Sequence, residues 1–286
     1  MPSVAIVTDS TSCLPQEEVG RYGIEVVPVN LVYEGRVYRD GLDLTPEEFY
    51  RLLKEAKKLP TTSPASPGDY LEVFRRVGEK TRSILCISVS ARLSGMFDSA
   101  RAAAELAREV LPRTAIRVLD SGTAAMAQGF VVLAAARAAR AGKELQEVMD
   151  TATRIMPRVE LVAVLDTLHY LARGGRVPKA AAWVTSLLQI KPILTLSAGE
   201  VGLLERVHTR KKALSRLVQI MRKRAGGKRP LHASVFHANA LGEALALREE
   251  IIREFQPQEL YLTQFTSVMG VHTGPGVVGL AYYAED

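Results

Sequence analysis

The sequence contains little of what several common protein classes require. Its 286 residues include only two cysteines, Cys13 and Cys86, which are not in a Cys-x-x-Cys pair. This usage is typical of free thiols in a reducing compartment rather than of a secreted scaffold stapled by disulfides. No apolar stretch approaches the ~18 residues that a membrane-spanning helix needs. The first residues lack the basic flank of a signal peptide, so we expect a cytoplasmic protein without a spanning segment.

Sequence motifs for metal, nucleotide and serine hydrolase chemistry are also missing. The chain has no H-E-x-x-H, no G-x-x-x-x-G-K-[ST] and no G-x-S-x-G. His232 and His237, five positions apart, are expected to bracket a strand rather than to bind zinc. Residues 274–279 formally match G-x-G-x-x-G, but no βαβ unit and no acidic residue about 20 positions later follow them. We therefore expect no metal site and no nucleotide cofactor.

The remaining composition is that of an ordinary globular protein. Hydrophobic residues make up 47% of the chain, and 37 Lys and Arg against 31 Asp and Glu give a formal charge of +6. That excess is too modest to indicate nucleic acid binding by itself. A length of 286 residues favours two domains over one.

Strand-like apolar runs alternate with amphipathic segments, which predicts an α/β fold. The Ala-rich runs 99–110 and 124–141 are expected to be helices, and Gly142 suits the end of the second. Thr45 and Ser66, each followed by proline, are typical of helix starts. The expected strands are 4–8, 84–89, 116–119, 161–165, 192–196, 234–236 and 260–263.

The pattern changes after Pro157. Segments 193–197 and 201–207 flank a short turn and predict a β-hairpin within an otherwise alternating pattern. We place a domain boundary near Met156, giving an N-terminal domain of residues 1–156 and a C-terminal domain of residues 157–286. The first should contain a mostly parallel sheet flanked by helices, and the second a mixed sheet with helices.

Three short segments combine hydroxyl groups, glycine or proline with strand ends, where α/β folds present ligand groups. Residues 60–67 place three consecutive hydroxyl residues between prolines, and taken alone they favour a rigid helix-to-helix connector whose hydroxyls cap helices. Residues 88–95 follow an expected strand and suit either an anion site or ordinary helix caps. Residues 270–276 place His272 in what we expect to be a glycine-rich loop after a strand.

These segments, with four others, resemble the DegV family of bacterial fatty acid-binding proteins along essentially the whole chain. The residues that carry the resemblance are Asp9-Ser10-Thr11, Thr61-Thr62-Ser63, Leu93-Ser94-Gly95, Asp120-Ser121, Leu171-Ala172-Arg173-Gly174-Gly175-Arg176, Ile190-Lys191-Pro192-Ile193-Leu194 and His272-Thr273-Gly274-Pro275-Gly276.

The resemblance implies a two-domain α/β carrier that binds one long-chain fatty acid, such as palmitate, between its domains. It implies no catalytic residue and no cofactor in this chain. The carrier presents the fatty acid carboxylate to a partner fatty acid kinase, and the resulting acyl phosphate enters phospholipid synthesis. In the family the head group is held by hydroxyls that correspond to Thr62 and Ser94. By their motifs, Thr61, Ser63 and His272 line the same site, with Gly95, Gly274 and Gly276 in neighbouring loops.

Two positions depart from the family pattern. Met96 stands where we expect threonine after Leu-Ser-Gly, which removes a polar group near the head group. His208 stands where the family more often has arginine, so Arg210 is a possible substitute contact for the kinase. Arg173 and Arg176, which flank a glycine pair, are further candidate partner contacts or simply part of a helix end.

A basic segment from Arg206 to Arg229 holds ten cations and no acidic residue. It fits a solvated helix face, an acidic kinase surface or transient contact with an anionic membrane. The acyl tail would lie in a tunnel whose lining the sequence does not assign; the candidate lining residues are Met96, Phe97, Leu168, Trp183, Leu187 and Leu188.

Two other functions remain as alternatives. The first is a serine acyl hydrolase or transferase with Ser94 as nucleophile and His272 as base, although no acidic orienter can be picked from the sequence. The second is a nucleic acid binder using the basic segment, but aromatic residues are only 6% of the chain and none lies within that segment. We therefore expect no nucleic acid partner.

Overall fold

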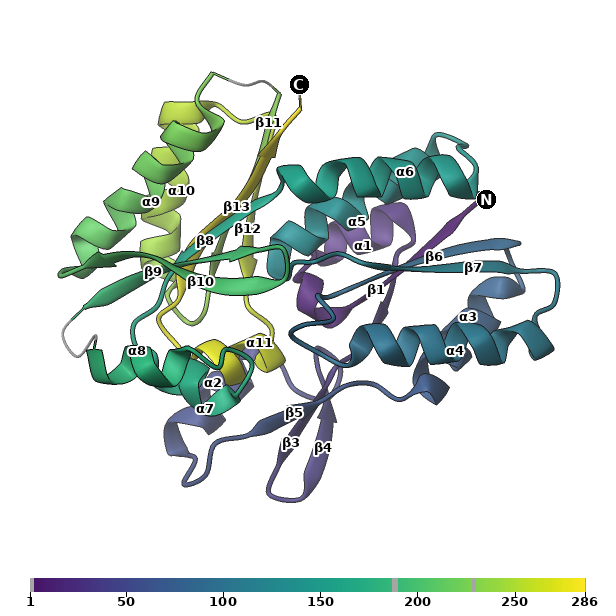
Figure 1. Ribbon diagram of the computed structural model, residues 1–286, viewed down its shortest axis with the longest axis horizontal. Coiled ribbons are helices and arrows are strands. Elements are labelled where there is room, and N and C mark those ends of the chain that lie inside the picture. The colour runs from purple at the N-terminus through teal and green to yellow at the C-terminus, as the bar shows by residue number, and fades with distance from the viewer. Residues whose placement is uncertain (1–2, 187–189, 228–229, 286) are drawn as a thin grey trace.

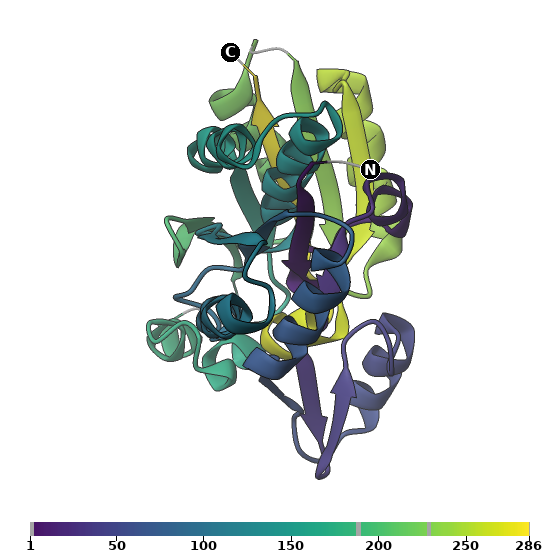
Figure 2. The same ribbon diagram turned by 90° about the vertical axis from the view of Figure 1, so that its right-hand side faces the viewer.

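The structure, a computed structural model, describes residues 3–186, 190–227 and 230–285 and arranges them around three β-sheets (Figure 1). We call these the parallel sheet, the mixed sheet and the small sheet. The parallel and mixed sheets lie side by side, and the small sheet projects away from both of them in Figures 1 and 2.

The parallel sheet has the strand order β2-β1-β6-β7, and every neighbouring pair is parallel. Its strands are β1 (Ala5–Asp9), β2 (Glu25–Val27), β6 (Ser83–Ser88) and β7 (Ala115–Asp120). The central strands β1 and β6 are almost entirely buried, as expected for a sheet with helices on both faces. These helices are α1 (Gln16–Tyr22), α5 (Ala125–Arg140) and α6 (Leu145–Ile155) on one face and α3 (Pro67–Gly78) and α4 (Met96–Val110) on the other.

The mixed sheet has the order β10-β9-β8-β13-β11-β12, in which only β11 and β12 run parallel. Its strands are β8 (Glu160–Val164), β9 (Lys191–Ser197), β10 (Glu200–Val207), β11 (Leu231–His237), β12 (Glu259–Gln264) and β13 (Val278–Ala284). Helices α9 (Arg210–Ala225) and α10 (Leu241–Phe255) cover one face. The predicted hairpin is confirmed as β9 and β10, joined at Ala198 and Gly199, both with positive φ.

The small sheet is antiparallel and was not predicted. It comprises β3 (Asn30–Tyr33), β4 (Arg36–Arg39) and β5 (Thr61–Ser63), with β3 in the centre. Its strands are only three or four residues long, and β4 is mostly exposed, so the sequence shows no apolar run there that marks a strand. The remaining elements are α2 (Pro46–Glu55), α7 (His169–Gly174), α8 (Ala180–Ser186), α11 (Ser267–Thr273) and the single turns η1 (Ser10–Ser12) and η2 (Met156–Arg158).

The α/β class, the parallel first sheet and the mixed second sheet are as predicted. The predicted helix starts are confirmed, since the Thr45 hydroxyl accepts from the Glu48 amide and the Ser66 hydroxyl accepts from the Asp69 amide, each at 3.2 Å. One local prediction was wrong. His272 lies on α11 and not in a loop, because the glycine of that helix, Gly270, packs tightly against Phe49 and Tyr50 of α2.

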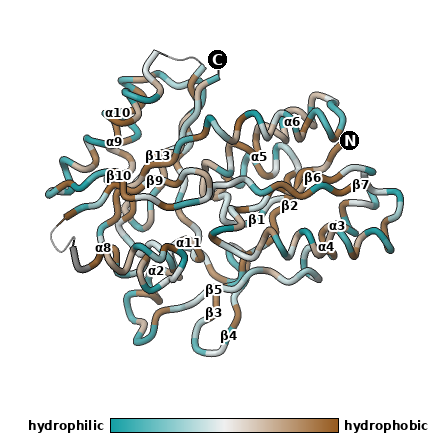
Figure 3. The backbone as a smooth tube through the Cα atoms, viewed as in Figure 1, coloured by the Kyte–Doolittle hydropathy of each residue, from teal (hydrophilic) through white to brown (hydrophobic). Residues whose placement is uncertain are grey.

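Successive side chains of β8 point to opposite faces of the mixed sheet, so each face of the sheet packs in a different hydrophobic core. Val162 and Val164 are buried with residues of α9 and α10, whereas Leu161 and Ala163 are buried with residues of the parallel sheet and its helices. Figure 3 shows the hydrophobic colour gathered along the strands of both larger sheets. Because one core contains side chains from both halves of the chain, the boundary near Met156 stays a prediction.

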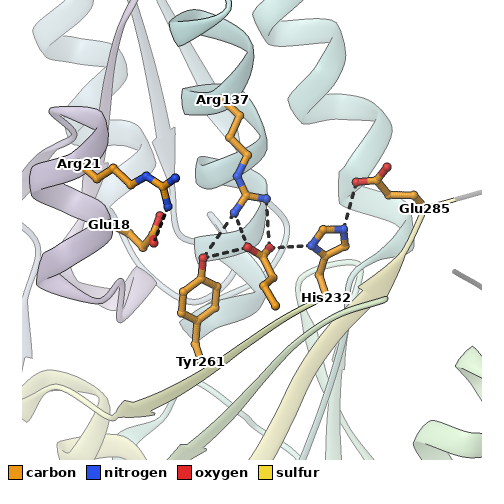
Figure 4. A network of polar contacts seen from close by, with 7 residues as sticks. Glu18, Arg21, Arg137, His232, Tyr261 and Glu285 are labelled. Carbon is orange, nitrogen blue, oxygen red and sulfur yellow. Dashed lines mark hydrogen bonds and ion pairs between the residues drawn. The ribbon is translucent and has the colours of Figure 1, made fainter. Parts of the chain in front are cut away.

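A polar network also joins the two halves (Figure 4). Arg137 of α5 forms two bonds to the carboxylate of Glu259 on β12, at 3.0 and 2.5 Å. His232 places Nδ1 2.7 Å from Glu259 and Nε2 3.0 Å from Glu285. Burial alone would raise the pKa of Glu259, but the bonds from His232 and Arg137 lower it to about 2. The network therefore ties α5 to the mixed sheet by charge as well as by packing.

Candidate functional site

A cavity lies at the junction of the three sheets. Its empty space is about 970 Å³, including the part open to solvent. It is lined by Thr11, Val29, Thr62, Val89, Leu93, Ser94, Ala124, Leu161, Ala163, Leu165, Leu171, Arg176, Val177, Leu194, Thr195, Leu196, Val201, Phe265, Val268, Met269, His272, Thr273 and Val277. Thr11, Val89 and Ala124 follow the carboxyl ends of β1, β6 and β7, where α/β folds bind ligands.

Most of the cavity wall is apolar. The mixed sheet contributes Leu161 and Ala163 from β8 and Leu194 and Leu196 from β9. The Thr195 hydroxyl donates to the carbonyl of Leu161 at 2.9 Å, so its hydrogen is already used. These side chains offer a ligand apolar surface rather than donors.

A second hydroxyl on the wall, that of Thr11, is tied to the buried carboxylate of Asp9. The same carboxylate accepts from the Ser88 hydroxyl at 3.2 Å and from the Val89 amide at 2.8 Å. Burial raises the pKa of Asp9, and these bonds oppose the increase. Asp9 therefore fixes the ends of β1 and β6 where both reach the cavity.

Polar groups with unused hydrogen-bonding capacity gather at one part of the wall. Thr62 of β5 places its hydroxyl 2.8 Å from Nε2 of His272 on α11, although the two residues are 210 positions apart. Arg176, just after α7, donates to the same hydroxyl at 3.4 Å and to the carbonyl of Gly174 at 2.8 Å. Thus three separate segments converge on one hydroxyl group.

His272 is neutral at physiological pH. Its burial lowers the pKa to about 4, and the nearby positive charge of Arg176 acts in the same direction. Nδ1 is buried and has no hydrogen-bond partner among the described residues. A buried N–H without an acceptor is less tolerable than a buried lone pair, which favours the proton on Nε2. In that tautomer His272 and Arg176 both donate to Thr62, leaving the Thr62 proton free for an acceptor in the cavity.

Gly174 makes this arrangement possible. A β-carbon at position 174 would lie 2.6 Å from Nδ1 of His272, so any larger residue would push the ring out of place. The motif Leu171–Arg176 thus contributes to the site in two ways, through close approach at Gly174 and through the side chain of Arg176.

Ser94 and Gly95 bring the α4 side of the site against the small sheet. Ser94 lines the cavity, and its hydroxyl accepts from the Met96 amide at 3.4 Å. A β-carbon at Gly95 would lie 3.3 Å from Pro64, so glycine allows the two segments to approach closely. Met96, which departs from the family pattern, is fully buried and accepts from the Ala65 amide through its sulfur at 3.1 Å. It supports the segment after Thr62 and is not on the cavity wall.

Gly274 and Gly276 lie directly after α11 with φ of +72° and +86°. A β-carbon at Gly274 would overlap the ring of Tyr170, and one at Gly276 would lie 2.8 Å from the β-carbon of Asp166. Both glycines therefore position α11, and with it His272, against α7 and the end of β8.

Asp40 fixes the other end of α11. Its buried carboxylate accepts from the Ser10 hydroxyl at 2.7 Å and from the Val268 amide at 3.4 Å. Burial raises the pKa of this carboxyl group. Asp40, Asp9 and Thr11 were not predicted from the sequence as supports of the site. The motif Asp9-Ser10-Thr11 was a signal for two of them, but nothing local marks Asp40.

The structure brings only part of the predicted set together. Thr62, Ser94, Arg176 and His272 line one cavity, but Thr61 and Ser63 are not on its wall. They flank Thr62 on strand β5, and successive residues of a strand point to opposite faces. None of the guessed tunnel residues Met96, Phe97, Leu168 and Trp183 lines the cavity, and Leu187 and Leu188 lie outside the described residues.

The basic segment has no acidic residue of its own, but other elements compensate much of its charge. Four of its arginines pair with acidic residues supplied by other elements, which lie far away in the sequence or on the preceding strand. These pairs are Arg210 with Glu243, Arg216 with Glu205, Arg222 with Glu254 and Arg224 with Glu160. Arg173 and His208 are exposed, whereas Arg210 is held by Glu243. Lys228 and Arg229 lie outside the described residues.

Within the described ranges, no group of three or more His, Cys, Asp or Glu side chains is placed to hold a metal ion. No helix in the same ranges is long and apolar enough to cross a bilayer.

Comparison with known proteins gives consistent similarities over the whole chain. A family model described as "Uncharacterised protein, DegV family" matches residues 3–285. A DegV domain-containing protein of Listeria monocytogenes is 35% identical over 280 residues, which cover 98% of each chain. A solved structure of a DegV family protein from Thermus thermophilus, described as fatty acid binding, has a TM-score of 0.92 at 33% identity. The structure of DegV from Bacillus subtilis, described as a fatty acid-binding protein, has a TM-score of 0.91 at 31% identity. Both structural matches cover 100% of each chain.

Proposed function

Since this chain belongs to the DegV family, we propose that it binds one long-chain fatty acid, such as palmitate, in the cavity at the junction of its sheets. The observation that carries the proposal is the combination of a mostly apolar wall with a small cluster of hydroxyl and neutral imidazole groups. The fatty acid-binding descriptions of the similar structures from Thermus thermophilus and Bacillus subtilis support it.

The apolar wall provides the affinity. Burying about fifteen methylenes contributes roughly 12 kcal/mol before association costs, at ~0.8 kcal/mol for each. Those costs amount to ~4 to 15 kcal/mol, so a stable but exchangeable complex is expected. Thr11 and Thr195 do not oppose this burial because their hydroxyl hydrogens are bonded within the protein.

Thr62 and Ser94 hold the carboxylate in this proposal. With His272 and Arg176 donating to Thr62, its proton is directed to an acceptor, and an ionised carboxylate accepts without donating. Each such bond to a charged group contributes ~1.5 to 3 kcal/mol. Thr61 and Ser63 would act indirectly, by holding β5 in the small sheet.

The chain itself is a carrier in this proposal and not a catalyst. Hydroxyl donors fix the carboxylate while leaving one oxygen free to attack a phosphoryl group, whereas a bidentate arginine would neutralise both oxygens. We infer a cytoplasmic partner kinase that phosphorylates the bound fatty acid for phospholipid synthesis. The exposed Arg173, Arg176 and His208 are the candidate contacts, and transient contact with a membrane surface would exchange the ligand.

The geometry disfavours the serine hydrolase alternative. Nε2 of His272 bonds Thr62 rather than Ser94, and no carboxylate among the described residues orients Nδ1. A catalytic base needs both contacts. With a pKa of about 4, the imidazole is also a weak proton acceptor.

Fatty acid extraction tests the proposed function. The purified protein is denatured and extracted with organic solvent, and fatty acids are counted by mass spectrometry. We expect close to one fatty acid per chain, and strong loss from the double variant Thr62→Ala/Ser94→Ala. Thr61→Ala/Ser63→Ala is the matched control, since it removes two neighbouring hydroxyls that do not line the cavity. A parent that is empty and takes up no added palmitate would refute the proposal.

A further inference from the structure

A second cavity, which shares no lining residue with the first, lies at the opposite end of the parallel sheet. Its empty space is about 1100 Å³, including the part open to solvent. It is lined by Val4, Ala5, Ile6, Arg21, Tyr22, Gly23, Glu25, Arg76, Val77, Lys80, Thr81, Ala136, Ala139 and Arg140. These residues lie at or next to the amino ends of β1 and β2 and the carboxyl ends of α1, α3 and α5, and Figure 2 looks onto this side of the molecule.

Positive charge dominates the rim. Four cations, Arg21, Arg76, Lys80 and Arg140, face the cavity with a single lining carboxylate, Glu25. Glu25 pairs with Arg76 at 2.6 Å, and Glu18, outside the lining, pairs with Arg21 at 3.5 Å. Lys80 and Arg140 form no ion pair with any described residue, so charge remains for an anion.

An aromatic ring holds two of the cations in place. The guanidinium carbons of Arg21 and Arg140 lie 5.4 and 5.6 Å from the centre of the Tyr22 ring. Arg140 also donates to the carbonyl of Arg21 at 2.9 Å. A planar guanidinium can form two parallel hydrogen bonds to a phosphate. The N–H groups of Arg140 that do not bond the Arg21 carbonyl have no carboxylate partner among the described residues.

The floor of the cavity is apolar. Val4, Ile6, Val77 and Ala139 line it and are buried. Pairing between β1 and β2 begins only at Val7 opposite Glu25, so no β2 residue pairs with β1 ahead of Val7. The floor therefore offers apolar surface to a ligand beside the cations of the rim.

We propose that this cavity binds a phosphate monoester that carries an apolar group. The phosphate lies among Lys80, Arg140 and the neighbouring arginines, and the apolar part covers the floor formed by Val4, Ile6 and Ala139. Both a soluble organic phosphate monoester and the headgroup of phosphatidic acid have this chemistry. The site is independent of the fatty acid cavity and of the function proposed for it.

Phenyl phosphate, followed by amide NMR of the fatty acid-loaded full chain, is the first test. It is too short to compete for a long apolar cavity, and phenol controls for the ring alone. We expect saturable shifts at Gly23 and Lys80 that phenol does not cause. Lys80→Glu/Arg140→Glu should weaken binding about tenfold or more, because it reverses the two cations without an ion pair. Absence of saturable shifts, together with no sedimentation on phosphatidic acid vesicles, would overturn the proposal.

A matched variant separates a site from general charge attraction. Lys211→Glu/Lys212→Glu makes the same change in net charge on α9, at exposed lysines that form no ion pair with a described residue. It should leave phenyl phosphate binding unchanged. An equal loss in both double variants would show that only net charge matters, which contradicts the proposal.

Vesicle sedimentation then assigns the source of the phosphate. Sedimentation with phosphatidic acid vesicles but not with phosphatidylcholine vesicles, lost in Lys80→Glu/Arg140→Glu, supports the proposal with a lipid headgroup as ligand. Phenyl phosphate binding without sedimentation supports it with a soluble ester as ligand. Failure of both probes overturns it.

Discussion

The buried His232 and the half-buried His272 have opposite surroundings in this protein. His232 is 2% exposed, stacks on Tyr283 with ring centres 4.4 Å apart, and has a carboxylate at each ring nitrogen. His272 has a hydroxyl at one ring nitrogen, no described partner at the other, and an arginine nearby. The first belongs to the network of Figure 4, and the second faces the cavity.

The difference shows how a polar cluster that stabilises a fold differs from one that is ready for a ligand. Around His232, each polar contact is made to another part of the protein, and the negative charges of Glu259 and Glu285 face Arg137 and the ring. Around His272, donors converge on Thr62 and leave its proton directed at an apolar cavity. Removing a residue should therefore cost stability in the first cluster and ligand affinity in the second.

The largest expected effect is on folding. Glu259→Gln leaves Arg137 and His232 without their shared carboxylate, and these groups are mostly buried. We expect the free energy of unfolding to fall by about 2 kcal/mol, with fatty acid content unchanged. Chemical denaturation measures the first and mass spectrometry the second. The control is Glu249→Gln, whose partner Arg248 is exposed, and which should cost no more than ~0.5 kcal/mol.

A somewhat smaller effect is expected on binding when His272 is replaced. His272→Gln places an amide donor near the position of Nε2 and should keep Thr62 directed at the ligand. His272→Asn places its amide near Nδ1 and should lower palmitate affinity about tenfold, equivalent to ~1.4 kcal/mol. Fluorescent ligand displacement measures both. Equal affinities in the two variants would mean that His272 does not orient Thr62.

The two clusters should also respond in different pH ranges. The folded pKa of His272 is lowered to about 4 from an ordinary 6.5, so the unfolded chain binds the proton first as pH falls. Stability should decline from about pH 6.5 to pH 4, and less so in His272→Gln.

The pKa of Glu259 is about 2 in the folded protein, below its ordinary value of 4.5. The ionised carboxylate therefore stabilises the folded protein at pH values above 4.5. That contribution is lost as pH falls from 4.5 toward 2, and Glu259→Gln should lack this part of the decline. Thermal unfolding across pH in the parent and both variants measures the two ranges. If His272→Gln and Glu259→Gln changed stability over the same pH range, the assignment of the two ranges to His272 and Glu259 would be wrong.

The smallest effect is expected on α9. Lys211→Glu/Lys212→Glu changes exposed lysines that form no ion pair with a described residue, so stability should change by no more than ~0.5 kcal/mol. Arg224→Gln breaks the pair with Glu160 of β8 and should cost more. Denaturation of both variants tests whether the compensated arginines, and not the free lysines, contribute to the fold.

Sequence patterns were sufficient where the signal is local. Apolar runs predict the buried strands β1 and β6, and a hydroxyl residue followed by proline predicts the starts of α2 and α3. Two strand-like segments around a short turn predict the hairpin β9–β10. The α/β class follows from their order. Thr62 and Ser94, the proposed head-group residues, were selected through family motifs rather than through any pattern of spacing.

The remaining features depend on contacts between distant residues. Acidic residues on β8, β10 and α10 compensate the arginines of α9, and no window of sequence displays that pairing. His272 lies on a helix because Gly270 fits against α2. Asp40 supports α11 from 228 positions away, so its role emerges only once the chain is folded.

The most direct test of the difference between the two histidine clusters is carbon-13 NMR of bound palmitate labelled at its carboxyl carbon. We predict one bound resonance that shifts in Thr62→Ala and in Ser94→Ala and keeps its position in Glu259→Gln. A bound resonance that is the same in all four proteins would place the carboxylate elsewhere and contradict the assignment of the head-group site.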